Sequence, residues 1–189
     1  FLERKIVFPD GSEWNISGPR IKNSQQNKFT FLKKNGPTLL AHDRILISGE
    51  IDRINDFEKG FPLHYTKRSG KWEQDPLIKD DQCLIVNVRN QGLVIITGCG
   101  HAGIVNSICY AQALTGIRDV CAVIGGFHLT GGIFEKIIPA TVAELKRINP
   151  RYIMPGHCTG WAAIHKIANE MPEAFIPNNV GTKLYITGF

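Results

Sequence analysis

The chain has 189 residues, of which 43% are hydrophobic and 21% are charged, and it carries a formal net charge of +5. These values are ordinary for a soluble globular protein, and they predict a single domain over residues 1–189 with a well-filled core. No apolar run approaches the roughly 18 residues that span a membrane, and no secretory signal is visible, so we expect no membrane partner. The basic residues form no aromatic–basic segment, which argues against nucleic acid. The positive charge is either that of an ordinary solvated surface, the preferred interpretation, or a sign of an anionic small-molecule partner such as a phosphate ester.

The five cysteines indicate a reducing compartment. An odd number of cysteines without a secretory signal is typical of free thiols inside the cell, and we therefore expect a cytoplasmic protein. Cys83, Cys109 and Cys121 lie in apolar surroundings and are expected to act as small core residues.

The first part of the chain is rich in strand and loop signals. Residues 1–16 predict a β-hairpin, because a Pro-Asp-Gly sequence at residues 9–11 is a strong turn signal. Residues 17–44 indicate mostly loop with one short strand, and residues 44–51 indicate a strand. Residues 52–79 are polar, contain aromatic residues and are too long for an ordinary connection, so we expect a substrate loop or lid there.

From residue 80 onward, the pattern alternates between strands and helices. The predicted elements are a hairpin of two strands (82–88 and 93–97), a helix (103–114), a strand (120–126), a helix (133–148), a strand (151–155), a helix (159–171) with Thr159 as its N-cap, an extended segment (174–176) and a closing strand (183–187). Together with the strand-rich start, this order predicts an α/β (α+β) fold in which mixed sheets are flanked by helices.

Three histidines occupy the same kind of position. His101 lies in TGCGHAG, His128 in GGFHL and His157 in PGHCTG, and each follows an apolar strand and lies in a glycine-rich turn. Such turns can bring three imidazoles to one edge of a sheet, and imidazole is the commonest protein ligand for zinc. The pattern predicts a metal site with His101 and His157 as ligands. For His128 four roles stay open: metal ligand, general acid or base, substrate contact, and buried structural histidine.

The remaining reactive side chains receive other interpretations. Cys99 and Cys158 flank the ligand candidates, but their spacing does not fit a structural zinc site. A cysteine nucleophile beside a histidine is an alternative that is disfavoured because neighbours on a turn tend to point apart. His42, His64 and His165 are interpreted as surface residues. The sequence contains no P-loop, GxGxxG, GxSxG or HExxH motif.

The GCGHAG, GGFHL and PGHCTG turns, in this order, resemble the C-terminal half of the metallo-β-lactamase superfamily. The closer likeness is to a branch labelled 7,8-dihydropterin-6-yl-methyl-4-(β-D-ribofuranosyl)aminobenzene-5′-phosphate synthase, and TGCGHAGIVN (97–106) carries much of it. The resemblance implies an αββα sandwich with one or two divalent metal ions at the sheet edge, usually zinc, with iron or manganese as alternatives. It also implies hydrolytic or related chemistry driven by water bound to the metal. By position, His101 and His157 match two metal-binding histidines of the superfamily.

Two departures from the superfamily pattern affect the expected site. The His-x-His-x-Asp-His motif is absent and would lie upstream of Phe1, so the chain looks like the C-terminal two-thirds of a longer protein, lacking its N-terminal part. The bridging aspartate of many members corresponds to Gly126 here, and His128 is the nearest substitute. This departure predicts one tightly bound metal, or a second metal that is held differently.

Three functions remain open from the sequence. The first is a metal-dependent hydrolase or transferase acting on an anionic small molecule such as a phosphate ester, with His128 as a catalytic residue and residues 52–79 over the pocket. The second is a non-catalytic half-domain that binds a partner, and the third is a nuclease of the same superfamily. The sequence is also compatible with a homo-oligomer.

Overall fold

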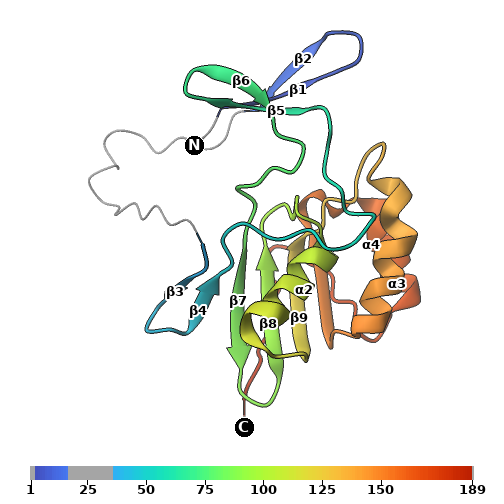
Figure 1. Cartoon of the computed structure of the whole chain (residues 1–189). Coiled ribbons are helices and arrows are strands. Elements are labelled where there is room, and N and C mark those ends of the chain that lie inside the picture. Colours follow the sequence, from blue (N-terminus) through green and yellow to red (C-terminus); the bar gives the residue numbers. More distant parts are fainter. Residues whose placement is uncertain (1–2, 17–35, 189) are drawn as a thin grey trace.

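The computed structural model describes residues 3–16 and 36–188, and within these ranges the chain forms two β-sheets and three α-helices (Figure 1). The mixed α/β class predicted from the sequence is confirmed. One sheet is four-stranded, with the order β2 (Glu13–Ile16), β1 (Arg4–Val7), β5 (His64–Arg68) and β6 (Lys71–Gln74). The other is six-stranded, with the order β10 (Tyr152–Gly156), β9 (Val120–Gly126), β8 (Gly92–Thr97), β7 (Cys83–Val88), β4 (Ile45–Ile47) and β3 (Thr38–Leu40).

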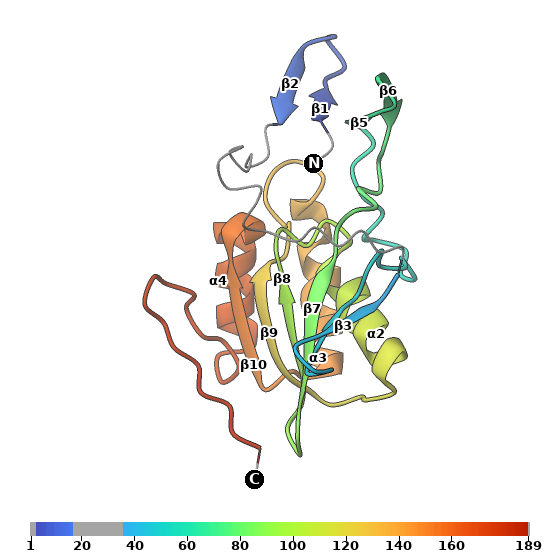
Figure 2. The same ribbon diagram turned by 90° about the vertical axis from the view of Figure 1, so that its left-hand side faces the viewer.

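Parallel pairing in the six-stranded sheet determines where the functional residues lie. β8 runs parallel to β9, and β9 runs parallel to β10, whereas β7 is antiparallel to β8. β8 and β9 are apolar along their length and mostly buried, as is typical of strands covered on both faces. The carboxyl ends of β8, β9 and β10 therefore share one edge, which is the upper edge of the sheet in Figures 1 and 2.

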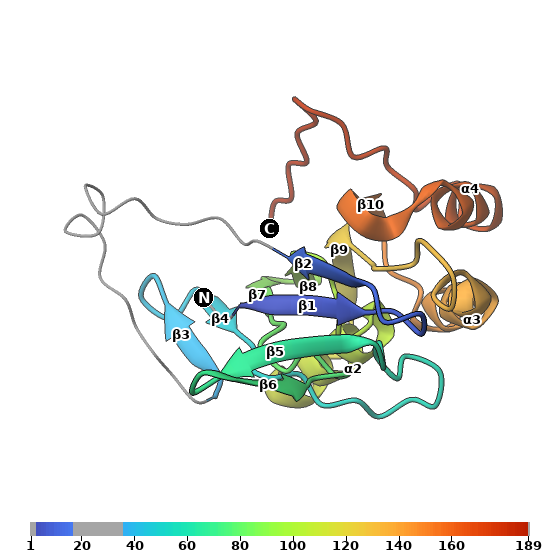
Figure 3. The same cartoon turned by 90° about the horizontal axis from the view of Figure 1, so that it is seen from above.

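Three helices cover one face of this sheet (Figure 3): α2 (Ile104–Thr115), α3 (Ile138–Ile148) and α4 (Trp161–Glu170). Apolar residues of α3 recur at helical spacing, so that Ile138, Val142 and Leu145 are all buried in the main core. Burying one such side chain contributes about 2 kcal/mol. The helices therefore hold the strand ends in place through a continuous apolar layer.

The opposite face of the sheet carries a smaller apolar cluster. Val94, Cys121 and Ala122 are buried there, and Leu184 and Ile186 of the C-terminal segment pack against them. The predicted closing strand at residues 183–187 is wrong, because this segment has no strand structure.

A neighbouring segment explains why the closing strand does not form. The free edge of β10 is already used, because Ile153 exchanges backbone hydrogen bonds with Ala174 and Ile176. The predicted extended segment at 174–176 is thereby confirmed. Residues 183–187 consequently contribute side chains to the sheet face and add no hydrogen-bonded strand.

The region predicted as a long loop contains a hairpin. Residues 64–74 form β5 and β6 of the four-stranded sheet, which lies beyond the upper edge of the larger sheet (Figures 1 and 2). The loop interpretation is wrong for this part, and His64 is buried, not on the surface as expected. Its Nδ1 atom lies 3.1 Å from the carbonyl oxygen of Asp75. Residues 52–63 remain without regular structure, and their contact with a substrate stays a prediction.

Smaller differences concern the ends of elements. α3 begins at Ile138, after a short 3-10 helix (Glu135–Ile137), and not at residue 133 as predicted. The predicted hairpin of residues 1–16 is confirmed by β1 and β2, whereas most of the predicted loop at 17–44 lies outside the described residues. In the part of the chain that the structure describes, no helix is long and apolar enough to cross a membrane.

Candidate functional site

The loops after β8, β9 and β10 converge at the upper edge of the six-stranded sheet. Gly126 at the end of β9 pairs with Gly156 at the end of β10, and β8 ends beside them at Thr97. His128 follows β9 by two residues, and His157 follows β10 directly. The strand register therefore brings the three histidine-bearing turns to the same edge, as predicted.

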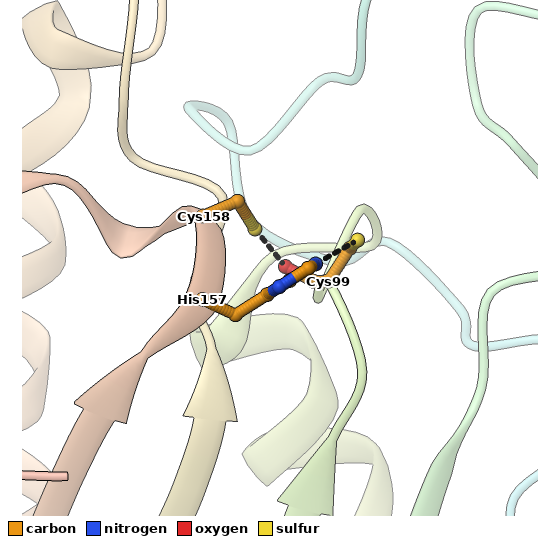
Figure 4. Close-up of side chains that lie close together, drawn as sticks. All are labelled: Cys99, His157 and Cys158. Carbon is orange, nitrogen blue, oxygen red and sulfur yellow. Dashed lines mark hydrogen bonds between the residues drawn. The ribbon is translucent and has the colours of Figure 1, made fainter. Parts of the chain in front are cut away.

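A cluster of two thiols and an imidazole lies at this edge (Figure 4). The Cys99 Sγ atom is 3.0 Å from His157 Nε2, and the Cys158 thiol donates to the Cys99 carbonyl oxygen at 3.0 Å. The ligand atoms of Cys99, His157 and Cys158 all lie within 4.8 Å of one another. In a tetrahedral zinc site the ligand atoms are about 3.5 Å apart, so small side-chain adjustments would bring all three onto one ion.

The surroundings of Cys99 favour its charged form. The Cys158 thiol, and then the imidazoles of His101 and His157, lower the pKa of Cys99 to about 3. The hydrogen bond with Cys99, followed by burial, raises the pKa of Cys158 well above its ordinary value. A thiolate beside two imidazoles is a donor set that suits zinc and other borderline or soft cations.

His101 is backed by a carboxylate. Its Nδ1 atom lies 3.6 Å from Asp81 Oδ1, while Asp81 Oδ2 accepts the backbone N–H of Ala102 at 2.9 Å. Burial raises the pKa of Asp81, although the Ala102 N–H and His101 work in the opposite direction. A carboxylate on one imidazole nitrogen is the usual way in which proteins orient a metal-binding histidine, because it leaves the other nitrogen for the ion.

His128 is held in an unusual position between two rings. Its backbone has a φ of 49°, in the left-handed region, and its ring meets that of His101 at a centroid distance of 4.5 Å and that of Phe134 at 4.4 Å. Its Nδ1 atom is buried and has no hydrogen-bond partner among the described residues. Burial, followed by the charge of His101, lowers the pKa of His128 to about 4. Most buried polar atoms in proteins have a hydrogen-bond partner, so the unpaired Nδ1 atom distinguishes His128 from an ordinary structural histidine.

A cavity of about 360 Å³ opens beside His101 and His128. Phe57, Phe134 and Ile133 supply apolar walls, and the charged lining residues are Arg53, Lys59 and the buried Glu58. Its size and mixed lining match those of small-molecule sites. The cavity connects the imidazoles to the irregular segment 52–63, which was predicted to contact a substrate.

A second polar group lies at the start of α2 and is fully hydrogen-bonded. The carboxylate of Glu58, only 2% exposed, accepts the backbone N–H groups of Val105 at 3.0 Å and Asn106 at 2.8 Å, and the side-chain amide of Asn55 at 2.7 Å. Burial raises the pKa of Glu58, and these hydrogen bonds oppose the rise. Glu58 therefore caps α2 from a distant loop and satisfies N–H groups that a helix start leaves free.

Arg53 ties the same loop to the site. Its guanidinium donates to the carbonyl oxygens of Glu58 at 3.0 Å and Ala102 at 3.1 Å, and it also contacts the carbonyl of Leu77. Burial lowers the pKa of Arg53, which nearby carboxylates counteract. Because Ala102 is adjacent to His101, the Arg53 contacts fix the loop that carries this histidine.

No protein-family model matches this chain. The chain is 30% identical over 178 residues to the 7,8-dihydropterin-6-methyl-4-(β-D-ribofuranosyl)-aminobenzene-5′-phosphate synthase of Methanocaldococcus jannaschii, covering 90% of this chain and 59% of the relative. It is 33% identical over 137 residues to an uncharacterised protein of the same organism, covering 72% of this chain and 48% of that protein. The chain thus spans about half to three-fifths of the length of these relatives.

The structural comparison decides the fold. A solved structure described as a metal-dependent hydrolase of the β-lactamase superfamily matches with a TM-score of 0.69 and 25% identity, covering 84% of this chain and 59% of that chain. The chain has a metallo-β-lactamase fold. The resemblance predicted from the three histidine turns is confirmed by the sequence and structure matches together.

Close contacts at the strand ends account for the glycine at position 126. A Cβ atom at this position would lie 2.5 Å from the Gly98 carbonyl oxygen and 2.9 Å from Cys158 Sγ. No aspartate fits there unless the backbone moves, because the loops after β8 and β9 touch through bare glycines. Cys158 lies where a carboxylate from residue 126 would begin, so a thiol is the donor nearest to the expected bridging position.

Part of this site was not predicted from the sequence. Cys99 and Cys158 were set aside because of their spacing, yet they lie with His157 in one cluster. The prediction of Thr159 as the N-cap of α4 is wrong, because the N-cap is Gly160. The Thr159 hydroxyl instead donates a hydrogen bond to the Gly156 carbonyl oxygen and accepts one from the Phe127 N–H. Thr159 therefore joins the ends of β9 and β10. Which residues bind a metal stays a prediction.

Proposed function

We propose that this protein is a metal-dependent enzyme of the hydrolase type that acts on an anionic small molecule. The observation that carries the proposal is the group formed by Cys99, His157 and Cys158, next to His101 and beside a cavity of about 360 Å³. The similarity to a metal-dependent hydrolase supports it from a separate direction. Metal-binding donors and a cavity of ligand size meet at the sheet edge where ligands of open α/β sheets bind.

The donor set fits a divalent cation. His101 and His157 are the proposed ligands, and Cys99 and Cys158 add thiol donors that the sequence analysis did not assign. Zinc suits this combination of nitrogen and sulfur best, with iron and manganese as alternatives. When bound, the cation supplies Lewis-acid polarisation of the substrate and stabilises negative charge that develops in the reaction.

The residues around the cavity have separate roles in this proposal. Lys59 attracts the anionic group of the substrate, which can be a phosphate ester, and Arg53 adds positive charge to the cavity while its guanidinium stays bonded to backbone carbonyls. His128 is the proposed catalytic residue, because its buried Nδ1 atom has no partner among the described residues and is free to bond to the substrate and to hold or move a proton. Phe57 and Phe134 exclude water from this end of the cavity.

A second candidate activity is that of a synthase-type transferase. The observation favouring it is the similarity over 90% of this chain to the dihydropterin-ribofuranosylaminobenzene-phosphate synthase. In that case Lys59 would position the phosphate of the substrate, and the cation would stabilise its charge. Five cysteines without a disulfide among the described residues agree with the proposed cytoplasmic location.

Metal content per chain tests the proposal, measured by inductively coupled plasma mass spectrometry after reconstitution with zinc, iron or manganese. We expect one or two equivalents in the unchanged protein and a loss of at least about tenfold in metal affinity for His157→Ala. The matched control is His165→Ala, an exposed histidine on α4, which should keep its metal. Absence of metal, or equal metal in both variants, would contradict the proposal and favour a half-domain that binds a partner without catalysis.

A further inference from the structure

Two thiols from different strand ends lie close together at the upper edge of the six-stranded sheet. Cys99 follows β8, and Cys158 follows β10, so β9 separates the strands that carry them. Their Sγ atoms lie within 4.8 Å of each other, and the Cys158 thiol donates to the Cys99 carbonyl oxygen at 3.0 Å (Figure 4). A disulfide bond places two sulfur atoms about 2.05 Å apart, so closing the pair takes a movement of up to about 3 Å.

Glycine keeps the space between the two cysteines open. A Cβ at Gly126 would lie 2.9 Å from Cys158 Sγ and 3.0 Å from the Cys99 carbonyl oxygen, so residue 126 places no side chain between the thiols. Cys99 is also flanked by Gly98 and Gly100, and the Cβ position of Gly98 meets nothing within 4 Å. Glycines on both sides give the backbone of Cys99 the freedom that the movement requires.

The other cysteines are less accessible or less reactive than this pair. Cys99 and Cys158 are half-buried at the sheet edge, whereas Cys83 and Cys121 are buried in the core. Cys109 is half-buried on α2, where it packs against the main core. Burial raises the pKa of Cys83, Cys109 and Cys121, which disfavours the thiolate form in which a cysteine reacts. A small oxidant is therefore expected to act first on the pair at the sheet edge.

Metal binding and a disulfide bond need the same sulfur atoms. A cysteine binds a metal as a thiolate, and a sulfur atom in a disulfide bond is no longer a thiolate. Oxidation of Cys99 and Cys158 would leave imidazoles as the remaining donors of the proposed centre, and a bound cation would in turn occupy both sulfur atoms. Disulfides that form inside a reducing compartment are usually transient and redox-sensing or catalytic.

We propose that Cys99 and Cys158 form a reversible disulfide bond when a peroxide oxidises them, and that this bond excludes the metal. One thiol and hydrogen peroxide first give a sulfenic acid and water. The sulfur of the other thiol then bonds to the sulfenic sulfur, and the hydroxyl group leaves with the thiol proton as a second water. The peroxide takes up two electrons, which a dithiol returns when it reduces the bond. The disulfide is independent of the proposed function, whereas the exclusion of metal rests on it.

Peptide mapping of the whole chain tests the disulfide. The reduced protein, freed of metal with a chelator, is treated with hydrogen peroxide, its remaining thiols are alkylated, and its tryptic peptides are identified by mass spectrometry. We expect two of the five thiols to escape alkylation and peptides 90–118 and 152–166 to be linked. Dithiothreitol should separate the two peptides again.

A matched variant identifies the cysteine within the first peptide. Peptide 90–118 contains both Cys99 and Cys109, so Cys109→Ser is the control. This variant should form the linked peptides as the unchanged protein does, whereas Cys99→Ser and Cys158→Ser should not. Absence of the link in the unchanged protein, or its loss in Cys109→Ser, would overturn the proposal.

Zinc binding by the same samples separates this inference from the proposed function. We expect zinc to slow the formation of the disulfide. The oxidised protein should bind zinc at least about tenfold more weakly than the reduced protein, because losing two ligands should cost at least as much as losing an outer partner of one ligand. Equal zinc affinity of the two forms would overturn the exclusion of metal.

The remaining outcomes decide between the two proposals. Linked peptides in a protein that binds no zinc in either form would support the disulfide and contradict the proposed function. Zinc binding by a protein that never forms the link would overturn the disulfide and leave the proposed function standing.

Discussion

Two groups of polar side chains contact the loop formed by residues 98–103. The two groups differ in whether their donors and acceptors already have hydrogen-bond partners. At the start of α2, the carboxylate of Glu58 and the guanidinium of Arg53 bond to backbone groups from several segments. At the sheet edge, Cys99, His157 and Cys158 have mainly one another, and the Nδ1 atom of His128 has no partner among the described residues.

This difference separates structural polar residues from those available for chemistry. A buried polar network whose members are all hydrogen-bonded makes its surroundings rigid, whereas thiols and imidazoles with free lone pairs can take up a ligand. The Glu58 group thus holds the loop that presents His101 to the cluster. Substitutions in the first group should change folding stability, and substitutions in the second should change metal binding.

The largest effect is expected from Glu58→Ala. The change removes an acceptor from two backbone N–H groups at the start of α2 and from Asn55, and leaving such buried donors unpaired lowers the free energy of unfolding by about 3 kcal/mol. Urea denaturation measures this loss. Glu50→Ala, which removes an exposed partner of Lys79, is the control and should change stability by less than about 0.5 kcal/mol. A loss below about 1 kcal/mol for Glu58→Ala would show that the network is not structural.

Gly103→Ala should be the next most disruptive change. Gly103 has a φ of 94°, and a Cβ there would collide with the side chain of Glu58, so we expect a loss of about 2 kcal/mol in the free energy of unfolding. Gly116→Ala is the matched control, because Gly116 also has a positive φ, 71°, but faces open space. Equal losses in the two variants would mean that backbone conformation alone, and not the contact with Glu58, sets the effect.

Asp81 lies between the Glu58 group and the metal-binding cluster. The substitution Asp81→Asn should reduce metal affinity about tenfold, or about 1.4 kcal/mol. The amide oxygen can still accept the Ala102 N–H, but the negative charge 3.6 Å from His101 Nδ1 is lost. Competition with a chromogenic chelator measures the affinity. Asp80→Asn, which changes the neighbouring carboxylate that pairs with Arg4, should leave the metal affinity unchanged. If both variants bind metal as the unchanged protein does, then Asp81 does not orient His101.

Cys158→Ser should have the smallest effect on stability, less than about 0.5 kcal/mol. The serine hydroxyl can donate to the Cys99 carbonyl oxygen in place of the thiol. Binding of Cd²⁺ should weaken more than binding of Mn²⁺, since a thiolate is the softer donor. Isothermal titration calorimetry measures both affinities, with Cys109→Ser as a control outside the cluster. An equal change for the two cations would show that Cys158 is not a ligand.

The edge at which the histidines meet could be predicted from the sequence because its cause is local. Apolar runs that end in glycine predict buried strands, and parallel strands place their carboxyl ends together. Asp81 could also have been found, because the hairpin of residues 82–88 and 93–97 was predicted, and its observed pairing of Cys83 with Thr97 places residue 81 near residues 98–101.

Other parts of the site depend on contacts between distant segments and were not predictable in this way. Glu58 reaches Val105 from a loop 47 residues earlier in the chain, and no sequence pattern marks such a cap. Spacing rules for zinc sites describe ligands on one short segment, whereas Cys99 and Cys158 come from the ends of different strands. The hairpin of β5 and β6 was missed because β6 is exposed along its length and shows no alternation of apolar and polar residues.

The contact between bare glycines at the strand ends has a consequence for how this protein can vary over evolution. A Cβ at Gly126 would lie 2.5 Å from the Gly98 carbonyl oxygen, and a Cβ at Gly100 would lie 2.4 Å from the Gly126 carbonyl oxygen, so neither residue can gain a side chain while the other loop keeps its path. We expect the three positions to change together among homologous sequences or not at all. A lineage that acquired an acidic residue at position 126 would first have to separate these two loops, so its set of metal ligands and its backbone would be inherited as one unit.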